Sequence, residues 1–177
     1  MIEEYLQTQG VDRSELEEEK KQSRVYPHRP DYTWEGVELV RYKPAGDNWE
    51  GTIRQVIIGY REDTKFHVRY FEISPGGYSS LEKHVHSHAV TVIRGRGKAV
   101  VGEDALDLGY LDNVYISPDT PHQFINNSSE PFGFLCVVDA ERDAPRDLDP
   151  EELTGLEANP RTRDLIRTGK IEFLTDK

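Results

Sequence analysis

The stretch GGYSSLEKHVHSHAVTVIRGRG, residues 76–97, decides the fold of this chain, because it holds three of the six histidines between two glycine turns. In a continuous strand every second side chain lies on one face. Glu82, His84, His86 and His88 would then share a face. Such a polar face is costly unless a divalent metal ion draws the neutral imidazoles and the carboxylate into one coordination sphere. The alternative is a solvated, histidine-rich edge strand.

Short runs rich in β-branched and aromatic residues lie on both sides of this stretch. Turn residues such as Pro75-Gly76-Gly77 and Gly95-Arg96-Gly97 separate the runs. Many short strands at close spacing predict an all-β sandwich or barrel, and the interleaved helices of an α/β fold are missing. The predicted strands are 37–42, 53–58, 66–73, 80–85, 88–94, 98–101, 114–117, 122–126 and 132–138.

A further histidine comes from a separate segment, PDTPHQF, residues 118–124. Pro121 fixes the backbone immediately before His122, at the start of a predicted strand. A rigid turn suits a metal ligand that must be held in place. We therefore predict that His122 joins the histidines of the first stretch.

Together, residues 76–97 and 112–126 (DNVYISPDTPHQFIN) resemble the two signature motifs of the cupin superfamily, G-x5-H-x-H-x3,4-E-x6-G and G-x5-P-x-G-x2-H-x3-N. The resemblance covers about residues 37–140. It is closest to small single-domain cupins of unassigned reaction. It implies an all-β double-stranded β-helix, a jelly-roll barrel, with one metal site inside its mouth and short helical appendages at both ends.

The resemblance also implies a ligand set. Counting back from Gly95 places His88 where the family usually has glutamate, and places His84 and Glu82 at the two histidine positions. The implied metal ligands are Glu82, His84, His88 and His122, with Glu82 also a proton acceptor if it leaves the metal. His86 would lie in a turn. The alternative register takes His84 and His86 as the histidine pair and leaves Val90 or Thr91 at the glutamate position.

Three imidazoles and one carboxylate leave one or two open positions on a metal ion, as catalysis requires. They suit one divalent ion per chain: Fe, Mn, Ni, Cu or Zn. The predicted substrate pocket contains Val90, Val92, Phe124 and Tyr70. We expect a mononuclear metalloenzyme that acts on a small organic molecule, with dioxygenase-type oxidation or cleavage favoured. Isomerase or lyase chemistry, and a non-catalytic, metal-stabilised module that binds a small ligand, are the alternatives.

Composition restricts the partners. The formal net charge of −11 disfavours binding to nucleic acid and to anionic membranes. The chain has no apolar run of about 20 residues and no secretory signal, so we expect a cytoplasmic protein. The single cysteine, Cys136, excludes an internal disulfide and is expected to pack in the core. Arg69, Arg94 and Arg96 could contact an anionic substrate, although a surface role is the simpler expectation.

Three regions are expected: an N-terminal arm (1–36), the barrel (37–140) and a C-terminal helical tail (141–177). In the arm, Ser14 would cap a short helix, with Glu17 as its capping-box partner. In the tail, Asp149 and Pro150 would start one helix, and a second would cover 160–168 and end at Gly169. A sheet edge at 37–58 would be covered in a homodimer.

Overall fold

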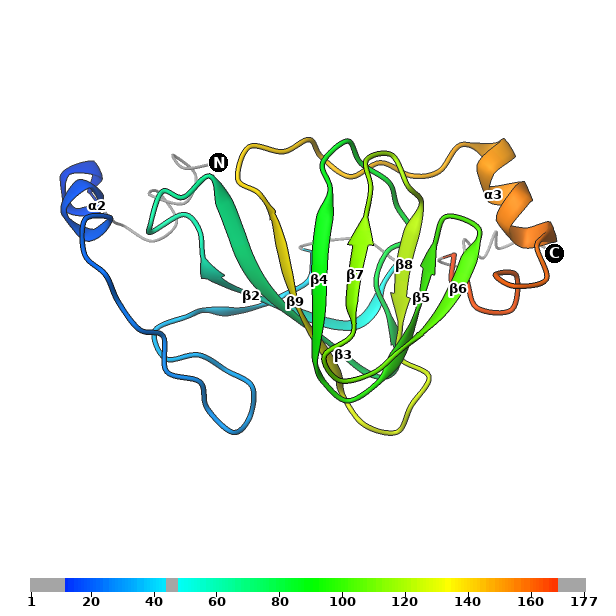
Figure 1. Cartoon of the computed structure of the whole chain (residues 1–177), viewed down its shortest axis with the longest axis horizontal. Helices are drawn as coiled ribbons and strands as arrows, with labels where there is room; N and C mark the ends of the chain where they lie inside the picture. Colours follow the sequence, from blue (N-terminus) through cyan, green and yellow to red (C-terminus); the bar gives the residue numbers. More distant parts are fainter. Residues whose placement is uncertain (1–11, 44–47, 169–177) are drawn as a thin grey trace, which may run out of the picture.

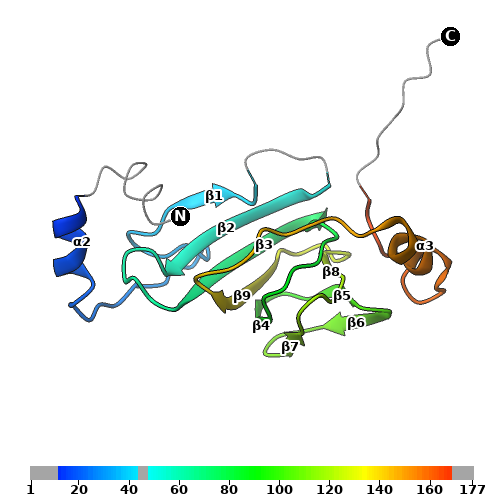
Figure 2. The same cartoon turned by 90° about the horizontal axis from the view of Figure 1, so that it is seen from above.

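The structure is a computed structural model and describes residues 12–43 and 48–168. Antiparallel strands form one sheet that curls round on itself, as the two views in Figures 1 and 2 show. The predicted all-β barrel with few helices is therefore confirmed. The strands are β1 (Leu39–Arg41), β2 (Glu50–Ile58), β3 (Phe66–Tyr78), β4 (His88–Arg94), β5 (Gly97–Val101), β6 (Asp104–Leu108), β7 (Asn113–Ile116), β8 (His122–Ile125) and β9 (Phe132–Asp139).

The long strand β3 organises the sheet. The strand order is β6-β5-β8-β3-β9-β4-β7, and β2 pairs with the other edge of β3 while β1 pairs with β2. In the register of β3 with β9, Arg69 is opposite Cys136 and Phe71 is opposite Phe134. This face of β3 points into the barrel, where the main core lies. That core contains Phe71, Ile73, Val90, Val92, Ala99, Leu108, Val114, Ile116, Phe124, Phe132, Phe134, Cys136 and Val138.

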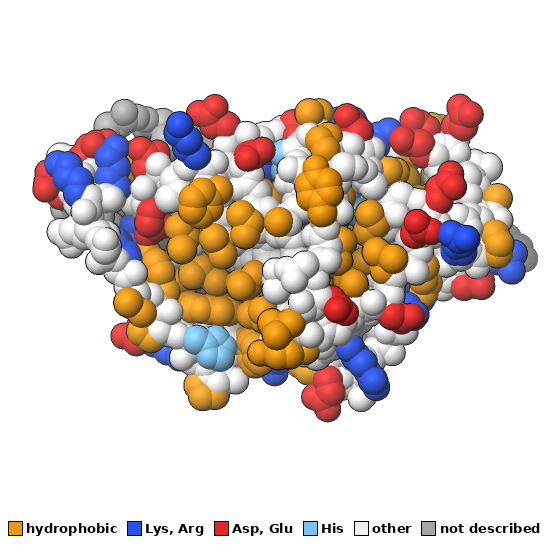
Figure 3. Space-filling view, viewed as in Figure 1, with side chains coloured by type: hydrophobic (Ala, Val, Ile, Leu, Met, Phe, Trp, Pro, Cys, Tyr) orange, Lys and Arg blue, Asp and Glu red, His pale blue; other side chains and the backbone are white. Residues whose placement is uncertain are grey.

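The outer face of β3 is also covered. Tyr70 is fully buried and packs against Trp34, with ring centroids 4.9 Å apart, in a second cluster that includes Ile57. Tyr26, Tyr32 and Trp34 of the N-terminal arm therefore pack against the outside of the sheet. Hydrophobic side chains gather around β9 on the face seen in Figure 3. Val137 of β9 is among the exposed large hydrophobic residues.

Two turns show why the barrel needs special backbone conformations. Gly95, which matches the last glycine of the first cupin motif, has φ 62°, and a Cβ there would lie 2.2 Å from the carbonyl oxygen of Pro131. Any other residue would clash with the backbone of the neighbouring segment. Asp119 has φ 58° at the position where the second motif usually has glycine. Aspartate is one of the few side chains that tolerate this left-handed region.

Two of the strand predictions were wrong. The predicted strand 80–85 does not form: Glu82 and Lys83 make only isolated bridges, to His122 and Arg146, and residues 84–87 are irregular. The regular strand alternation that was assumed for the histidine side chains is therefore absent from residues 84–87. Strand β6 is missing from the predicted strands, because its polar outer residues Asp104 and Asp107 hide its pairing with β5.

The helix predictions were partly right. Helix α2 (Arg13–Glu19) begins before Ser14, and its cap is Asp12, whose carboxylate accepts a hydrogen bond from the Ser14 amide at 2.7 Å. The prediction of Ser14 as cap was wrong because an aspartate two residues earlier supplies the acceptor. Helix α3 (Pro150–Ala158) has the predicted start, with a capping box between Asp149 and Glu152.

The predicted second C-terminal helix was also wrong, because residues 160–165 form turns. The side chain of Asn159 accepts a hydrogen bond from the Arg161 amide and redirects the chain into a turn. The predicted end at Gly169 lies outside the described residues. No helix in the described part of the chain is long and apolar enough to cross a membrane.

Candidate metal centre

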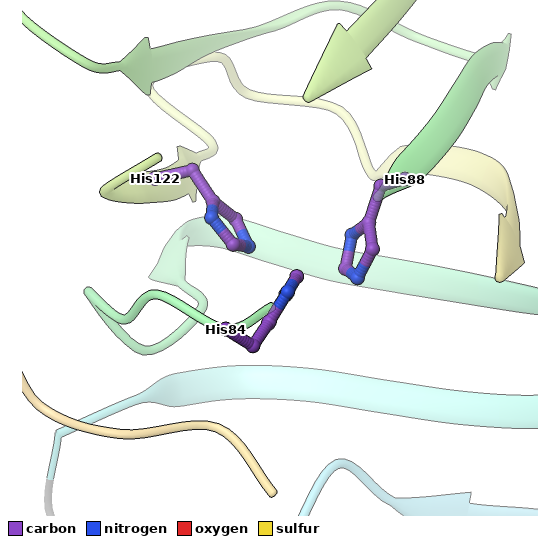
Figure 4. A group of neighbouring side chains, drawn as sticks. All are labelled: His84, His88 and His122. Atoms are coloured by element: carbon purple, nitrogen blue, oxygen red, sulfur yellow. The ribbon is translucent and has the colours of Figure 1, made fainter. Parts of the chain in front are cut away.

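Three segments deliver one histidine each to the same point inside the barrel. His84 lies in the irregular connection before β4, His88 is the first residue of β4, and His122 is the first residue of β8. Their imidazoles turn toward one another (Figure 4). One nitrogen from each lies within 4.8 Å of the other two, and all three residues are buried. This grouping could hold a metal ion.

Hydrogen bonds fix which nitrogen of two of these rings can bind a metal. His84 Nδ1 lies 2.7 Å from the carbonyl oxygen of His86, and His122 Nδ1 lies 2.9 Å from that of Thr120. A carbonyl can only accept, so both Nδ1 atoms carry the proton and both Nε2 atoms keep a lone pair. The backbone therefore prepares two metal-binding nitrogens.

Burial keeps the three rings neutral. It lowers the pKa of His84 to about 4, with His122 and His86 nearby adding to the effect. Burial also lowers the pKa of His88 and of His122. A neutral imidazole is the form that binds a metal. His88 Nδ1 lies 3.6 Å from Sγ of Cys136, which is buried in the neighbouring strand β9, as expected for a core cysteine.

One observation tests whether a metal fits these residues. His84 Nε2 is buried and has no hydrogen-bond partner within the described ranges. A buried nitrogen left unpaired costs about 1–3 kcal/mol of stability. An ion between the three rings would give this lone pair a partner, so the residues present fit a metal.

Glu82, the fourth predicted ligand, lies in the same cavity but has other partners. Its carboxylate accepts hydrogen bonds from Lys43 Nζ at 2.6 Å and from the Tyr42 hydroxyl at 3.2 Å. Its backbone exchanges two hydrogen bonds with His122. The metal-ligand grouping of the described residues contains the three histidines without Glu82. Its role as a ligand stays a prediction.

His86 also lies at the centre, in a bend. This agrees with the register that takes Glu82, His84 and His88 as ligands, in which His86 lies in a turn. Its ring stacks on that of His84, with centroids 3.6 Å apart, and its Nε2 is 3.2 Å from His88 Nε2. Its Nδ1 lies 2.7 Å from the carboxylate of Asp143, and this hydrogen bond lowers the pKa of Asp143. The choice between Glu82 and His86 as the next ligand is therefore still open.

The cavity around the centre has a volume of about 260 Å³. Of the four predicted pocket residues, Phe124 borders it, Val90 and Val92 pack in the main core, and Tyr70 belongs to the outer cluster. The lining residues are Tyr42, Lys43, Thr52, Arg54, Arg69, Phe71, Ser79, Ser80, Glu82, His84, His86, His88, His122, Phe124, Phe134, Cys136, Arg142 and Pro145.

Three polar residues of this cavity, Lys43, Arg54 and Arg142, were not predicted from the sequence, nor was Asp143, the partner of His86. Alternation along β3 could have assigned Arg69 to the inside, because Phe71 and Ile73 follow at spacings of two. Alternation would not have placed Arg54, since β2 has register irregularities near both ends. Arg94, one of the three arginines considered, lies apart from the cavity and pairs with Glu72 at 2.5 Å.

Comparison with known proteins gives related sequences and folds. Residues 69–138 match the Cupin domain family. The chain is 41% identical over 121 residues to the 1-methylthio-D-xylulose 5-phosphate methylsulfurylase of Rhodospirillum rubrum, an alignment that covers 68% of this chain and 77% of that protein.

Two solved structures extend the comparison. A cupin 2 conserved barrel domain protein from Rhodopseudomonas palustris has 38% identity and a TM-score of 0.75, with 82% of this chain and all of that chain (100%) covered. A cupin-2 domain protein from Rhodospirillum rubrum has 37% identity and a TM-score of 0.71, with coverages of 78% and 93%. The double-stranded β-helix implied by the two motifs is therefore confirmed.

Proposed function

The chain belongs to the cupin superfamily, and from this premise we propose that it is a metal-dependent enzyme acting on a methylthio ketose phosphate. The observation that carries the proposal is the 41% identity, over 77% of its length, to a relative named for 1-methylthio-D-xylulose 5-phosphate. The proposed reaction breaks the bond between carbon 1 and sulfur of such a substrate. A small thiol takes the methylthio group and becomes a mixed disulfide, and the thiol's proton goes to carbon 1, which becomes a methyl group beside the carbonyl. Carbon–sulfur chemistry beside a carbonyl needs a group that withdraws electrons from that carbonyl, and the centre described above has the residues to hold one.

His84, His88 and His122 would hold one divalent ion through their neutral imidazoles, with Glu82 as the proposed fourth ligand. When bound, such an ion supplies Lewis-acid polarisation of a carbonyl or hydroxyl oxygen. Lys43 holds the Glu82 carboxylate in place through their 2.6 Å ion pair. The aromatic side chains of Phe71, Phe124 and Phe134 exclude water from the same cavity and give an apolar surface for a methylthio group.

The direct test is turnover. Protein loaded separately with Mn, Fe, Ni, Cu or Zn would be incubated with 1-methylthio-D-xylulose 5-phosphate and a small thiol as acceptor, and the released sulfur compound measured. We expect release with at least one metal, and loss of release in His122→Ala. The proposal would be contradicted if the protein were fully loaded with each metal in turn and released no sulfur compound with any of them.

Oxygen-dependent oxidation, the reaction favoured by the motif resemblance, is a second candidate. The specific feature in its favour is three buried, neutral imidazoles beside an aromatic-lined cavity, which suits a redox-active ion as well as a Lewis acid. An oxygen electrode with a catechol and diketone panel distinguishes the two. Oxygen consumption without methylthio release favours oxidation, whereas saturable ligand binding with neither signal favours a non-catalytic binding module.

A further inference from the structure

Three arginines line the same cavity as the histidines: Arg54 of β2, Arg69 of β3, and Arg142, which follows β9. Arg69 is 8% exposed, and Arg54 and Arg142 are half-buried. No aspartate or glutamate in the described ranges forms an ion pair with any of the three. In addition, Nε of Arg54 and Nε of Arg69 are buried and have no hydrogen-bond partner there.

Such an arrangement is unfavourable in the absence of an anion. Burial lowers the pKa of Arg54 and of Arg142, and in both cases the positive charge of Arg69 adds to the effect. A buried charge that lacks a counter-charge destabilises the folded chain. Two other half-buried cations do have one: Lys43 pairs with Glu82 and Arg94 pairs with Glu72. The three arginines differ from both of them in this respect.

The charge of the cavity is opposite to that of the chain. Its lining includes four cationic side chains and one carboxylate, Glu82, whereas the whole chain has a formal net charge of −11. A concave, low-dielectric site with this charge concentrates anions. Guanidinium groups match the oxygens of a phosphoryl group, because their planar donors can form two parallel hydrogen bonds.

The arginines are close enough to the histidines for one ligand to reach both. Arg69 Nη2 lies 3.3 Å from Cys136 Sγ, and this sulfur lies 3.6 Å from His88 Nδ1. The cysteine therefore separates the two groups by a single side chain. A ligand with an oxygen donor at one end and an anion a few bonds away would contact both groups within the 260 Å³ cavity.

We propose that Arg54, Arg69 and Arg142 form an anion subsite that binds the phosphoryl group of a phosphate monoester. The inference rests on the proposed function for the sugar that carries the phosphate. The subsite itself is argued from the buried, unpaired Nε donors of Arg54 and Arg69 and from the positive charge of Arg142, whose Nη1 already donates to the carbonyls of Asp139 and Ala140. The sugar carbonyl or hydroxyl end would then face His84, His88 and His122. Arg69 holds the central position, because it contacts Cys136 on one side and its charge reaches both other arginines.

The test is calorimetric titration with D-xylulose 5-phosphate, D-xylulose and inorganic phosphate. These probes lack the methylthio group, so binding is measured without the proposed reaction. Phosphate can also coordinate a metal, and each titration is therefore done on metal-loaded and on metal-free protein. The variants are Arg69→Gln and Arg54→Gln, with Arg96→Gln as the matched control because Arg96 is an exposed arginine outside the cavity.

We expect Arg69→Gln to weaken binding of the sugar phosphate and of inorganic phosphate roughly 10- to 100-fold, with D-xylulose affinity and metal content unchanged. Arg54→Gln should act in the same direction, and it keeps the test valid if Arg69→Gln fails to fold. Arg96→Gln should bind like the unaltered chain. Equal phosphate affinity in both cavity variants and the unaltered chain would overturn the inference, as would equally tight binding of acetate.

The two proposals fail in different ways. Phosphate binding that depends on the arginines, without methylthio release by any metal form, would leave the anion subsite standing and remove the proposed reaction. Methylthio release that is unchanged in Arg69→Gln and Arg54→Gln would support the proposed reaction and count against the anion subsite.

Discussion

The cavity is lined by two groups of nitrogen-bearing side chains, which we call the histidine wall (His84, His88 and His122) and the arginine wall (Arg54, Arg69 and Arg142). The first offers hydrogen-bond acceptors and the second offers donors. On one wall, His84, His88 and His122 present neutral rings whose lone pairs accept. On the other, Arg54 and Arg69 present buried N–H donors without partners in the described ranges. Each wall alone is a cost to folding, since buried polar groups need partners. Together they suit a cation and an anion, and so a ligand that carries both an oxygen donor and a phosphoryl group.

The largest expected difference between the walls is in metal content. His84→Ala, His88→Ala and His122→Ala each remove one of three ligands, and we expect bound metal after purification and dialysis to fall at least about tenfold. Arg69→Gln should leave it unchanged, because Arg69 reaches the histidines only through the Cys136 sulfur, which lies 3.3 Å from Arg69 Nη2 and 3.6 Å from His88 Nδ1. Elemental analysis per mole of protein measures this. If all three histidine variants keep their metal, these histidines are not its ligands, and the two walls do not differ in metal binding.

The same measurement on Glu82→Ala and His86→Ala resolves the order of the ligands. If Glu82→Ala loses its bound metal while His86→Ala keeps it, the register in which Glu82 is the fourth ligand is supported. The opposite result supports the alternative register.

A smaller effect concerns pH and the arginine wall. Burial, together with Arg142, Arg69 and Arg54, lowers the pKa of His67 from 6.5 to about 4, against a weaker opposing effect of Glu62. The unfolded chain therefore binds more protons between pH 6.5 and 4, so the stability that neutral His67 contributes is present above pH 6.5 and is lost as the pH falls toward 4. Between pH 7 and 5 this loss is up to about 2 kcal/mol.

Urea unfolding of the metal-free chain and of His67→Gln at pH 7 and pH 5 measures this effect. The metal-site histidines titrate equally in both proteins, so the difference between the two chains isolates His67. Identical pH dependence of the two proteins would show that burial and the arginines do not lower the pKa of His67.

The smallest expected effect is a gain in stability. Arg54→Met removes one of three crowded cations while keeping an apolar chain of similar length, so metal-free, phosphate-free protein should be stabilised by about 1 kcal/mol. For a chain of this size, that raises the melting temperature by roughly 2–4 °C. Differential scanning calorimetry with and without phosphate provides the control, since phosphate should stabilise the unaltered chain more than the variant. A lower melting temperature for the variant would argue against the charge crowding.

The sequence allowed the barrel to be predicted, and it singled out His84, His88 and His122, which the structure groups together. His122 was found because a proline turn precedes it, and Gly95 because it matches the last glycine of the first motif. The structure gives the physical reason for that glycine, which has φ 62° and lies against the Pro131 carbonyl. Strand alternation, however, did not hold from 84 to 87, where the chain is irregular. His84 reaches the centre because Nδ1 is anchored on the His86 carbonyl, which is a loop contact and has no periodic signal.

The arginine wall was not predictable in the same way. Charged residues in a strand favour a solvent-facing interpretation, and only Arg69 lies in a run whose alternation places it with buried neighbours. Arg54 is separated from such a run by irregular pairing at both ends of β2. Arg142 lies beyond β9, in a segment without regular structure, where its position depends on tertiary packing alone.

The most direct test of the account is the position of the metal. Crystals of metal-loaded protein, measured at the absorption edge of the added ion, would give an anomalous difference map. The account predicts one peak per chain at bonding distance from Nε2 of His84 and of His122 and from a ring nitrogen of His88. A peak at other residues would contradict the account. So would crystals grown with saturating metal in which only water lies between the three histidines.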